Sequence, residues 1–315
     1  MQVLKLGEII KQEKKSIVSV GNFDGVHRGH RHLLTTIVSQ AKQKHMWSVV
    51  LTFEPHTRFI LNPDKPFEIL TNFNEKVHLI ALAGIDYVVQ IPFTISFSEL
   101  TPEEFIRSIL IKQLNAQEWA MGEGHGIGKG RTGTKNFLHK LLSKYHIISF
   151  TADLLMQQKT IVSSTQIREN ITAGRIVEAV EMLGHPYLIS TVRIEGLKIG
   201  SQLGFPTLNF ARPPSQKVLP PPGVYTAELE YKDQKQAGAL YFGDCPTFAD
   251  RTTHFEFHAL NADHVFPEVG EEVRLWLHTF IRNDRTFATK EALAAQIDID
   301  VKTIKNFFRG EGSCH

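Results

Sequence analysis

Cysteine is scarce in this chain, which has two in 315 residues. Cys245 and Cys314 lie far apart and match no zinc spacing, which argues against a metal-thiolate site and for a reducing compartment. A large excess of one charge sign is missing too, since the formal net charge is +2. A net charge this small disfavours sequence-independent electrostatic binding to nucleic acid, so we expect no nucleic-acid partner.

Long apolar runs are also absent. No segment approaches the roughly 20 apolar residues of a membrane span, and the first residues, MQVLK, contain no apolar signal core. We therefore expect a soluble cytoplasmic protein with no membrane partner. The length indicates about two domains, each able to bury its own core. A monomer and a weak homo-oligomer both remain open.

The first half of the chain alternates strand-like and helical patterns, which predicts a parallel sheet covered on both faces. The predicted strands are residues 17–20, 48–53, 87–91, 118–121 and 147–150, and the predicted helices include 74–83, 102–114 and 136–145. Helical patterns over residues 164–183 end at a stop signal, Gly184-His185-Pro186.

The second half changes character, because strand patterns follow one another without helices between them. These are residues 188–193, 224–231, 236–242, 253–260 and 273–280, followed by a helical pattern at 290–308. Such spacing suggests a small closed barrel. The predicted fold class is α/β: a doubly wound parallel-sheet domain at residues 1–184, then a small β-barrel domain with a C-terminal helix at 185–315.

The most informative segment is residues 21–30, GNFDGVHRGH, between the first strand and an amphipathic helix. A helix N-terminus has unpaired N–H groups and suits an anion such as phosphate. His27 and His30 are three residues apart, so a helical first turn places both rings over one face. The plain alternative is a strand-turn-helix with two exposed histidines.

This arrangement resembles the HxGH signature of the nucleotidyltransferases. IVSSTQIR, at residues 161–168, is similar to the SSTxIR element of the same superfamily, and its Ser163, Ser164 and Thr165 predict a helix N-cap. Residues 21–30 and TFEPH, at residues 52–56, are together similar to one branch, the bacterial FAD synthetases (FMN adenylyltransferases).

The resemblance implies transfer of AMP from MgATP to FMN, giving FAD and pyrophosphate. His27 and His30 would then act near the reacting α-phosphorus, and Arg168 would hold the departing pyrophosphate. Further ATP contacts are expected at Gly21, Asn22, Phe23, Asp24, Gly29, His56, Ser163, Ser164 and Thr165.

A glycine-rich run has two interpretations. Residues 128–133, GKGRTG, match GxGxxG between a strand-like run and a helix, so a dinucleotide-binding oxidoreductase is an alternative. In the FAD synthetase family the run is similar to a loop that helps hold the flavin. Gly124, His125 and Ile127 stand there in place of an acidic or amide residue and two phenylalanines. With Arg282, they form the predicted flavin-binding set.

The second half resembles the riboflavin kinases. Residues 196–209, GLKIGSQLGFPTLN, carry the GFPTxN motif, and GVY (223–225), CPTF (245–248) and EFH (256–258) follow in that family's order. Thr207 and Asn209 are oxygen ligands two residues apart, which suits Mg²⁺ bridging ATP phosphates. Gly204 is expected to contact ATP, and Glu256 to accept a proton from the hydroxyl nucleophile.

Together the halves resemble the bacterial bifunctional riboflavin kinase/FAD synthetases over nearly all of the chain. The resemblance implies ATP, FMN and riboflavin as substrates, FAD as product and Mg²⁺ as cofactor. Ser201 replaces a usual arginine, and HVFP, at residues 264–267, replaces a loop close to Asp-Leu-Tyr-Gly. These departures leave open a chain that only makes FAD, with a barrel that binds flavin or nucleotide without catalysis.

Overall fold

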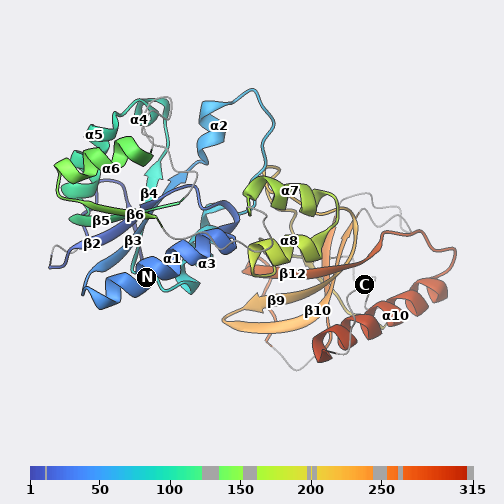
Figure 1. Ribbon diagram of the computed structural model, residues 1–315. Helices are drawn as coiled ribbons and strands as arrows, with labels where there is room; N and C mark the ends of the chain where they lie inside the picture. The colour runs from blue at the N-terminus through green and yellow to red at the C-terminus, as the bar shows by residue number, and fades with distance from the viewer. Residues whose placement is uncertain are drawn as a thin grey trace. The chain divides into compact units, whose positions relative to one another are not determined.

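A computed structural model describes residues 1–10, 13–122, 135–151, 162–196, 200, 204–243, 254–261 and 265–310. The chain forms two compact units, Met1–Val162 and Ser163–His315 (Figure 1). No helix within the described ranges is long and apolar enough to cross a membrane.

The first unit is built on a six-stranded sheet in which every neighbouring pair is parallel. Its order is β1-β4-β3-β2-β5-β6. The strands are β1 (Gln2–Lys5), β2 (Ser16–Val20), β3 (Trp47–Glu54), β4 (Tyr87–Pro92), β5 (Ala116–Met121) and β6 (Ile148–Thr151). The chain builds outward from β2 to β4 and then returns to β5 on the other side of β2. Ligands in such sheets bind at this switch point, beyond the carboxyl ends of the strands.

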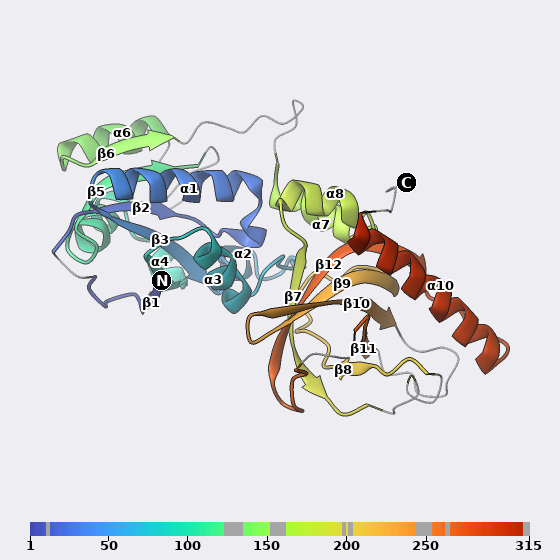
Figure 2. The same cartoon turned by 90° about the horizontal axis from the view of Figure 1, so that it is seen from below.

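Helices cover both faces of this sheet, as predicted (Figure 2). One core contains apolar side chains of α5 (Pro102–Phe105), the π-helix η2 (Ile106–Ile111) and α6 (Lys135–Lys144) packed on the strands. The remaining helices are the 3₁₀-helix η1 (Asp24–Val26), α1 (Arg28–Gln43), α2 (Thr57–Leu61), α3 (Phe73–Leu82) and α4 (Ile95–Ser98). β1, α2 and α4 had not been predicted, because they are short and present little apolar pattern.

The second unit contains the predicted closed barrel, with order β10-β11-β8-β7-β12-β9 and antiparallel pairing. Its strands are β7 (Tyr187–Ile194), β8 (Leu208–Phe210), β9 (Gly223–Tyr231), β10 (Gln234–Gly243), β11 (His254–Ala259) and β12 (Glu272–Asn283). The helices are α7 (Ser164–Thr172), α8 (Ile176–Leu183) and α10 (Lys290–Arg309). The short β8 had not been predicted.

The helices before the barrel belong to its compact unit, because α8 packs on β7 and β12. The domain boundary predicted after residue 184 stays a prediction.

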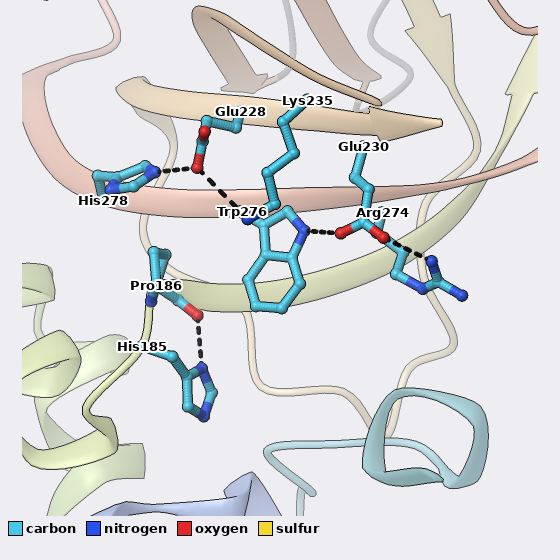
Figure 3. A network of polar contacts seen from close by, with 8 residues as sticks. All are labelled: His185, Pro186, Glu228, Glu230, Lys235, Arg274, Trp276 and His278. Carbon is cyan, nitrogen blue, oxygen red and sulfur yellow. Dashed lines mark hydrogen bonds and ion pairs between the residues drawn. The ribbon is translucent and has the colours of Figure 1, made fainter. Parts of the chain in front are cut away.

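A network of polar contacts joins β9 to β12 on the barrel wall (Figure 3). The Glu230 carboxylate accepts hydrogen bonds from Trp276 Nε1 at 2.6 Å and Arg274 Nη1 at 2.8 Å. Two residues earlier on β9, Glu228 lies 2.8 Å from His278 Nε2, and this hydrogen bond lowers the pKa of Glu228. The network ties two strands of the barrel through buried or half-buried charges.

Candidate active sites

The glycine-rich loop after β2 is fixed by a buried carboxylate. Asp24 Oδ1 accepts hydrogen bonds from the backbone N–H groups of Leu70, at 2.9 Å, and Thr71, at 3.0 Å. Thr71 Oγ1 also accepts one from Gly25 N. Phe23 and Gly25 adopt positive φ angles of 48° and 79°. The loop therefore has one defined path into α1.

Asn22 connects the same loop to β3 and α2. Its Nδ2 donates to Thr57 Oγ1 at 3.0 Å, and its carbonyl accepts from Thr52 Oγ1 at 3.2 Å. Gly21 N donates to Leu51 O, which continues the pairing of β2 with β3. Asn22 and Asp24 thus order the turn, and their contact with ATP stays a prediction.

His27 and His30 lie together at the start of α1. His27 is the N-cap residue, and its Nδ1 accepts a hydrogen bond from His30 N at 3.4 Å. The two rings are stacked, with centroids 3.7 Å apart and planes at 16°. A Cβ at Gly29 would lie 3.4 Å from the His27 ring. The close pairing expected from the spacing is therefore present.

The two histidine rings have different environments. Because His27 Nδ1 accepts a hydrogen bond, its neutral ring carries hydrogen on Nε2 and can donate from there. Burial lowers the pKa of His30 well below its ordinary value, and repulsion from Lys76 and from His27 in its protonated form lowers it further. His30 Nδ1 is buried and has no hydrogen-bond partner within the described part of the chain.

His56 repeats the capping arrangement at the end of β3. It is the N-cap of α2, and its Nδ1 accepts from Arg58 N at 3.1 Å. The ring packs against Phe67, with centroids 4.6 Å apart. His56 is buried, and a neutral ring that accepts at Nδ1 carries its hydrogen on Nε2.

Lys76 is a residue of this region that the sequence analysis missed. It lies on α3 and is 2% exposed. Its Nζ donates to Thr52 Oγ1 at 3.2 Å and to Phe53 O at 3.4 Å, near the carboxyl end of β3. The available signal was its position on the apolar stripe of α3, three and four residues before Leu79 and Ile80.

The SSTxIR element opens α7, as predicted. Ser163 is the N-cap, with its Oγ accepting from Gln166 N at 3.3 Å. Ser164, Thr165 and Arg168 follow in the first turns of that helix. This helix belongs to the second compact unit, so the roles of these residues toward the phosphates near His27 stay predictions.

The predicted flavin contacts are only partly placed. Gly124, His125, Ile127 and the GxGxxG residues lie outside the described residues. Arg282 lies on β12, where its Nη2 is 2.8 Å from Asp300 Oδ2 of α10. Its Nε also donates to that carboxylate. In this structure Arg282 ties α10 to the barrel, and its contact with flavin stays a prediction.

The barrel brings Thr207, Asn209 and Glu256 together. Asn209 of β8 lies directly opposite Glu256 of β11 in antiparallel register. Thr207 Oγ1 donates to Glu256 Oε2 at 3.0 Å. Phe255 and Phe257 are fully buried, which places them on the opposite face of β11 from Glu256.

Two glycines of the kinase-like motif let the chain approach this cluster. A Cβ at Gly196 would lie 2.0 Å from Asn209 Nδ2, and one at Gly200 would lie 2.4 Å from the Phe205 carbonyl oxygen. Gly204 has a φ of +85° and open space around it. Side chains at Gly196 or Gly200 would displace the residues predicted to contact ATP.

The donor atoms of this cluster fit Mg²⁺. A hydroxyl, an amide oxygen and a carboxylate are hard oxygen ligands, and Mg²⁺ is commonly held by one or two carboxylates together with water and substrate phosphates. No group of three His, Cys, Asp or Glu side chains suited to a metal occurs among the described residues. A metal held by this cluster would complete its coordination with oxygens of ATP and water.

Comparisons with known proteins identify one family in each half of the chain. The FAD synthetase family matches residues 9–166 and the riboflavin kinase family matches residues 183–308. The bifunctional riboflavin kinase/FMN adenylyltransferase of Escherichia coli (strain K12) is 33% identical over 293 residues, covering 93% of this chain and 92% of that protein. Its counterpart in Bacillus subtilis (strain 168) is 31% identical over 303 residues, covering 95% of each.

A solved structure has the same fold. It is described as a macrolide-efflux protein from Streptococcus pneumoniae, and it matches with a TM-score of 0.83 and 26% identity, covering 96% of this chain and 99% of that one. The two family matches and the full-length relatives lead to one assignment: this chain belongs to the bifunctional riboflavin kinase/FMN adenylyltransferases, with an FAD synthetase domain followed by a riboflavin kinase domain.

Proposed function

We propose that this protein converts riboflavin to FMN with its barrel unit and FMN to FAD with its parallel-sheet unit, using ATP in both reactions. The observation that carries the adenylyltransferase assignment is the stacked His27–His30 pair at the N-terminus of α1, where the chain leaves β2 at the switch point of the sheet. The family assignment replaces the oxidoreductase alternative.

In adenylyl transfer, a phosphate oxygen of FMN bonds to the α-phosphorus of ATP while the bond to the bridging oxygen breaks. Pyrophosphate leaves with that electron pair. His27 donates from Nε2 to a phosphate oxygen, and neutral His30 lies beside it. Catalysis is then positioning and charge stabilisation, with no enzyme-bound intermediate. Arg168 and the Ser163–Ser164 hydroxyls hold the pyrophosphate.

In the kinase reaction, Glu256 accepts the proton of the riboflavin hydroxyl as its oxygen attacks the γ-phosphorus of ATP. The hydrogen bond from Thr207 orients the carboxylate. Mg²⁺, held by Thr207 and Asn209 together with the phosphates, supplies charge neutralisation when bound. We further propose a cytoplasmic protein, monomeric or weakly self-associating, without nucleic-acid or membrane partners.

Product separation tests both activities. The purified chain is incubated with MgATP and either riboflavin or FMN, and flavins and pyrophosphate are quantified. We expect FMN and FAD from riboflavin, and FAD with equimolar pyrophosphate from FMN. FAD from FMN without any FMN from riboflavin would support the alternative of a non-catalytic barrel. Failure to form either product would contradict the proposed function.

A further inference from the structure

Lys76 is a buried cation that the reaction described above does not use. A buried ammonium is unfavourable unless anionic or other strong acceptors surround it. Both acceptors of its hydrogen bonds, the Thr52 hydroxyl and the Phe53 carbonyl, are neutral oxygens. Within the described residues it forms no ion pair with a carboxylate. The ligand-free unit therefore retains a buried positive charge whose compensation is incomplete.

The two carboxylates that stabilise the charged form of Lys76, those of Asp24 and Glu54, do not fully compensate its burial. Asp24 and Glu54 both favour the charged lysine, yet burial outweighs them and holds the pKa of Lys76 below its ordinary value. Asp24 Oδ1 already accepts backbone hydrogen bonds from Leu70 and Thr71. Burial also raises the pKa of Glu54, so that carboxylate is itself less readily ionised.

Hydrogen bonds connect Lys76 to the loop of residues 21–27, which precedes α1. Its Nζ donates to Thr52 Oγ1, and the same hydroxyl donates to the carbonyl of Asn22 in the loop. Its charge also contributes to the lowered pKa of His30. The ammonium and the two histidines therefore share one poorly solvated region at the carboxyl ends of β2 and β3.

His30 supplies a second observation that points to a ligand. Its Nδ1 is buried without a hydrogen-bond partner among the described residues. A buried polar atom in a native structure is normally satisfied, and an absent ligand is one reason for an exception. A buried cation and an unsatisfied imidazole nitrogen in the same region are complementary to an anion with several oxygen atoms.

We propose that Lys76 is a further catalytic residue of the adenylyltransferase site, whose ammonium contacts the phosphate chain of ATP beside His30. This inference rests on the function proposed for the first unit. The contact neutralises negative charge on the phosphate oxygens as the bond from FMN forms and the bond to pyrophosphate breaks. Lys76 transfers no proton, so the balance of the reaction is unchanged.

The first test replaces Lys76 with methionine, which has a similar length and no charge. We expect kcat/KM for FAD formation from FMN to fall about 100-fold or more, as for loss of a preorganised group at a developing charge. FMN formation from riboflavin by the same preparation should be unchanged. Lys42→Met, at an exposed position of α1, is the matched control and should keep wild-type rates of both reactions.

A stability measurement separates a catalytic role from a structural one. Because Lys76→Met removes a buried charge, the ligand-free variant should unfold at the same temperature as wild type or a higher one. Lost FAD formation together with a lowered unfolding temperature would assign Lys76 a structural role and overturn the proposal. Retention of more than a third of the wild-type kcat/KM would overturn it as well.

Equilibrium binding without FMN tests the contact even if no FAD is formed. Because ATP is proposed to bind to both units, Lys76→Met should weaken one of two ATP-binding events at least tenfold. Adenosine binding should be unchanged, because adenosine lacks phosphates. Equal weakening of both ligands, or of neither, would contradict a phosphate contact. A wild-type protein that binds ATP through Lys76 yet makes no FAD would overturn the proposed function and retain the phosphate contact.

Discussion

The imidazole rings of His27 and His30 are stacked at 3.7 Å, and the backbone N–H of His30 donates to Nδ1 of His27. One hydrogen bond therefore caps α1 and also selects the ring nitrogen of His27 that carries hydrogen. The same device recurs at His56, whose Nδ1 accepts from Arg58 N at the start of α2. Both capping histidines can present Nε2–H to an anion.

His30→Ala should lower the rate of FAD formation from FMN on the order of a hundredfold, because a donor beside the developing phosphate charge is lost. The kinase reaction of the same sample should not change. His32→Ala, two residues along α1, serves as the control and should remain close to wild type. A His30→Ala rate above a third of wild type, with unchanged ATP affinity, would show that the site has been misplaced.

Glu256→Gln should reduce FMN formation from riboflavin by about 100-fold or more, the usual range for a positioned base. The amide oxygen can still accept the hydrogen bond from Thr207, so the local arrangement should persist. FAD formation from FMN should be unaffected, and it reports on the integrity of the preparation. Wild-type FMN production would rule out Glu256 as the base.

Gly196→Ala should damage the kinase site selectively. The added Cβ would lie 2.0 Å from Asn209 Nδ2, so Asn209 would have to leave its place opposite Glu256. We expect a raised KM for ATP in FMN formation together with a lower kcat. Steady-state kinetics of both reactions check this, and unchanged kinase parameters would mean that Asn209 does not need this position.

The stability of the first unit should depend on pH through His30. Its pKa is well below the ordinary value in the folded state, so below about pH 6.5 the unfolded chain binds a proton that the folded chain does not. Stability is therefore present at neutral pH and falls as the pH decreases toward the folded-state pKa. Denaturant unfolding between pH 7.5 and 5.5 should show a smaller acid loss for His30→Gln than for wild type, and an equal loss would contradict this origin.

A fragment of residues 1–184 should make FAD from FMN, whereas a fragment of residues 1–162 should not, because it lacks the SSTxIR residues Ser163–Arg168. The longer fragment exposes the face of α8 that packs on the barrel, including Ile176, Ala179 and Leu183. Solubility and activity of the two fragments can be compared directly. An active 1–162 fragment would remove these residues from the adenylyltransferase mechanism.

Local patterns were sufficient to predict the alternating elements of the first unit apart from β1, α2 and α4, and the barrel strands apart from β8. Thr207, Asn209 and Glu256 were identified through the resemblance to riboflavin kinases, and alternation along a strand is consistent with the burial of Phe255 and Phe257 on either side of Glu256. Lys76 was not predictable in the same way. A lysine within an amphipathic helix is usually placed at its solvent edge, and its burial depends on packing against β3.

Arg282 illustrates the same limit in the barrel. The residues next to Arg282 in the sequence do not indicate its partner. Asp300 of α10 forms an ion pair and hydrogen bonds with the guanidinium of Arg282. Asp24 likewise forms hydrogen bonds with residues far away in the sequence, Leu70 and Thr71. Such contacts depend on the tertiary arrangement, which periodicity and motif spacing do not contain.

The anchoring of Asp24 has a consequence for biosynthesis. Its partners lie 46 and 47 residues farther along the chain, so the two histidines are synthesised well before the backbone groups that hold their loop. A nascent chain that ends before Leu70 would contain the complete HxGH segment, but the Asp24 carboxylate would lack the backbone N–H groups that donate to it in the folded unit. The nucleotide site should therefore mature late, when the start of α3 docks, and ATP should protect this region from proteolysis only after that step.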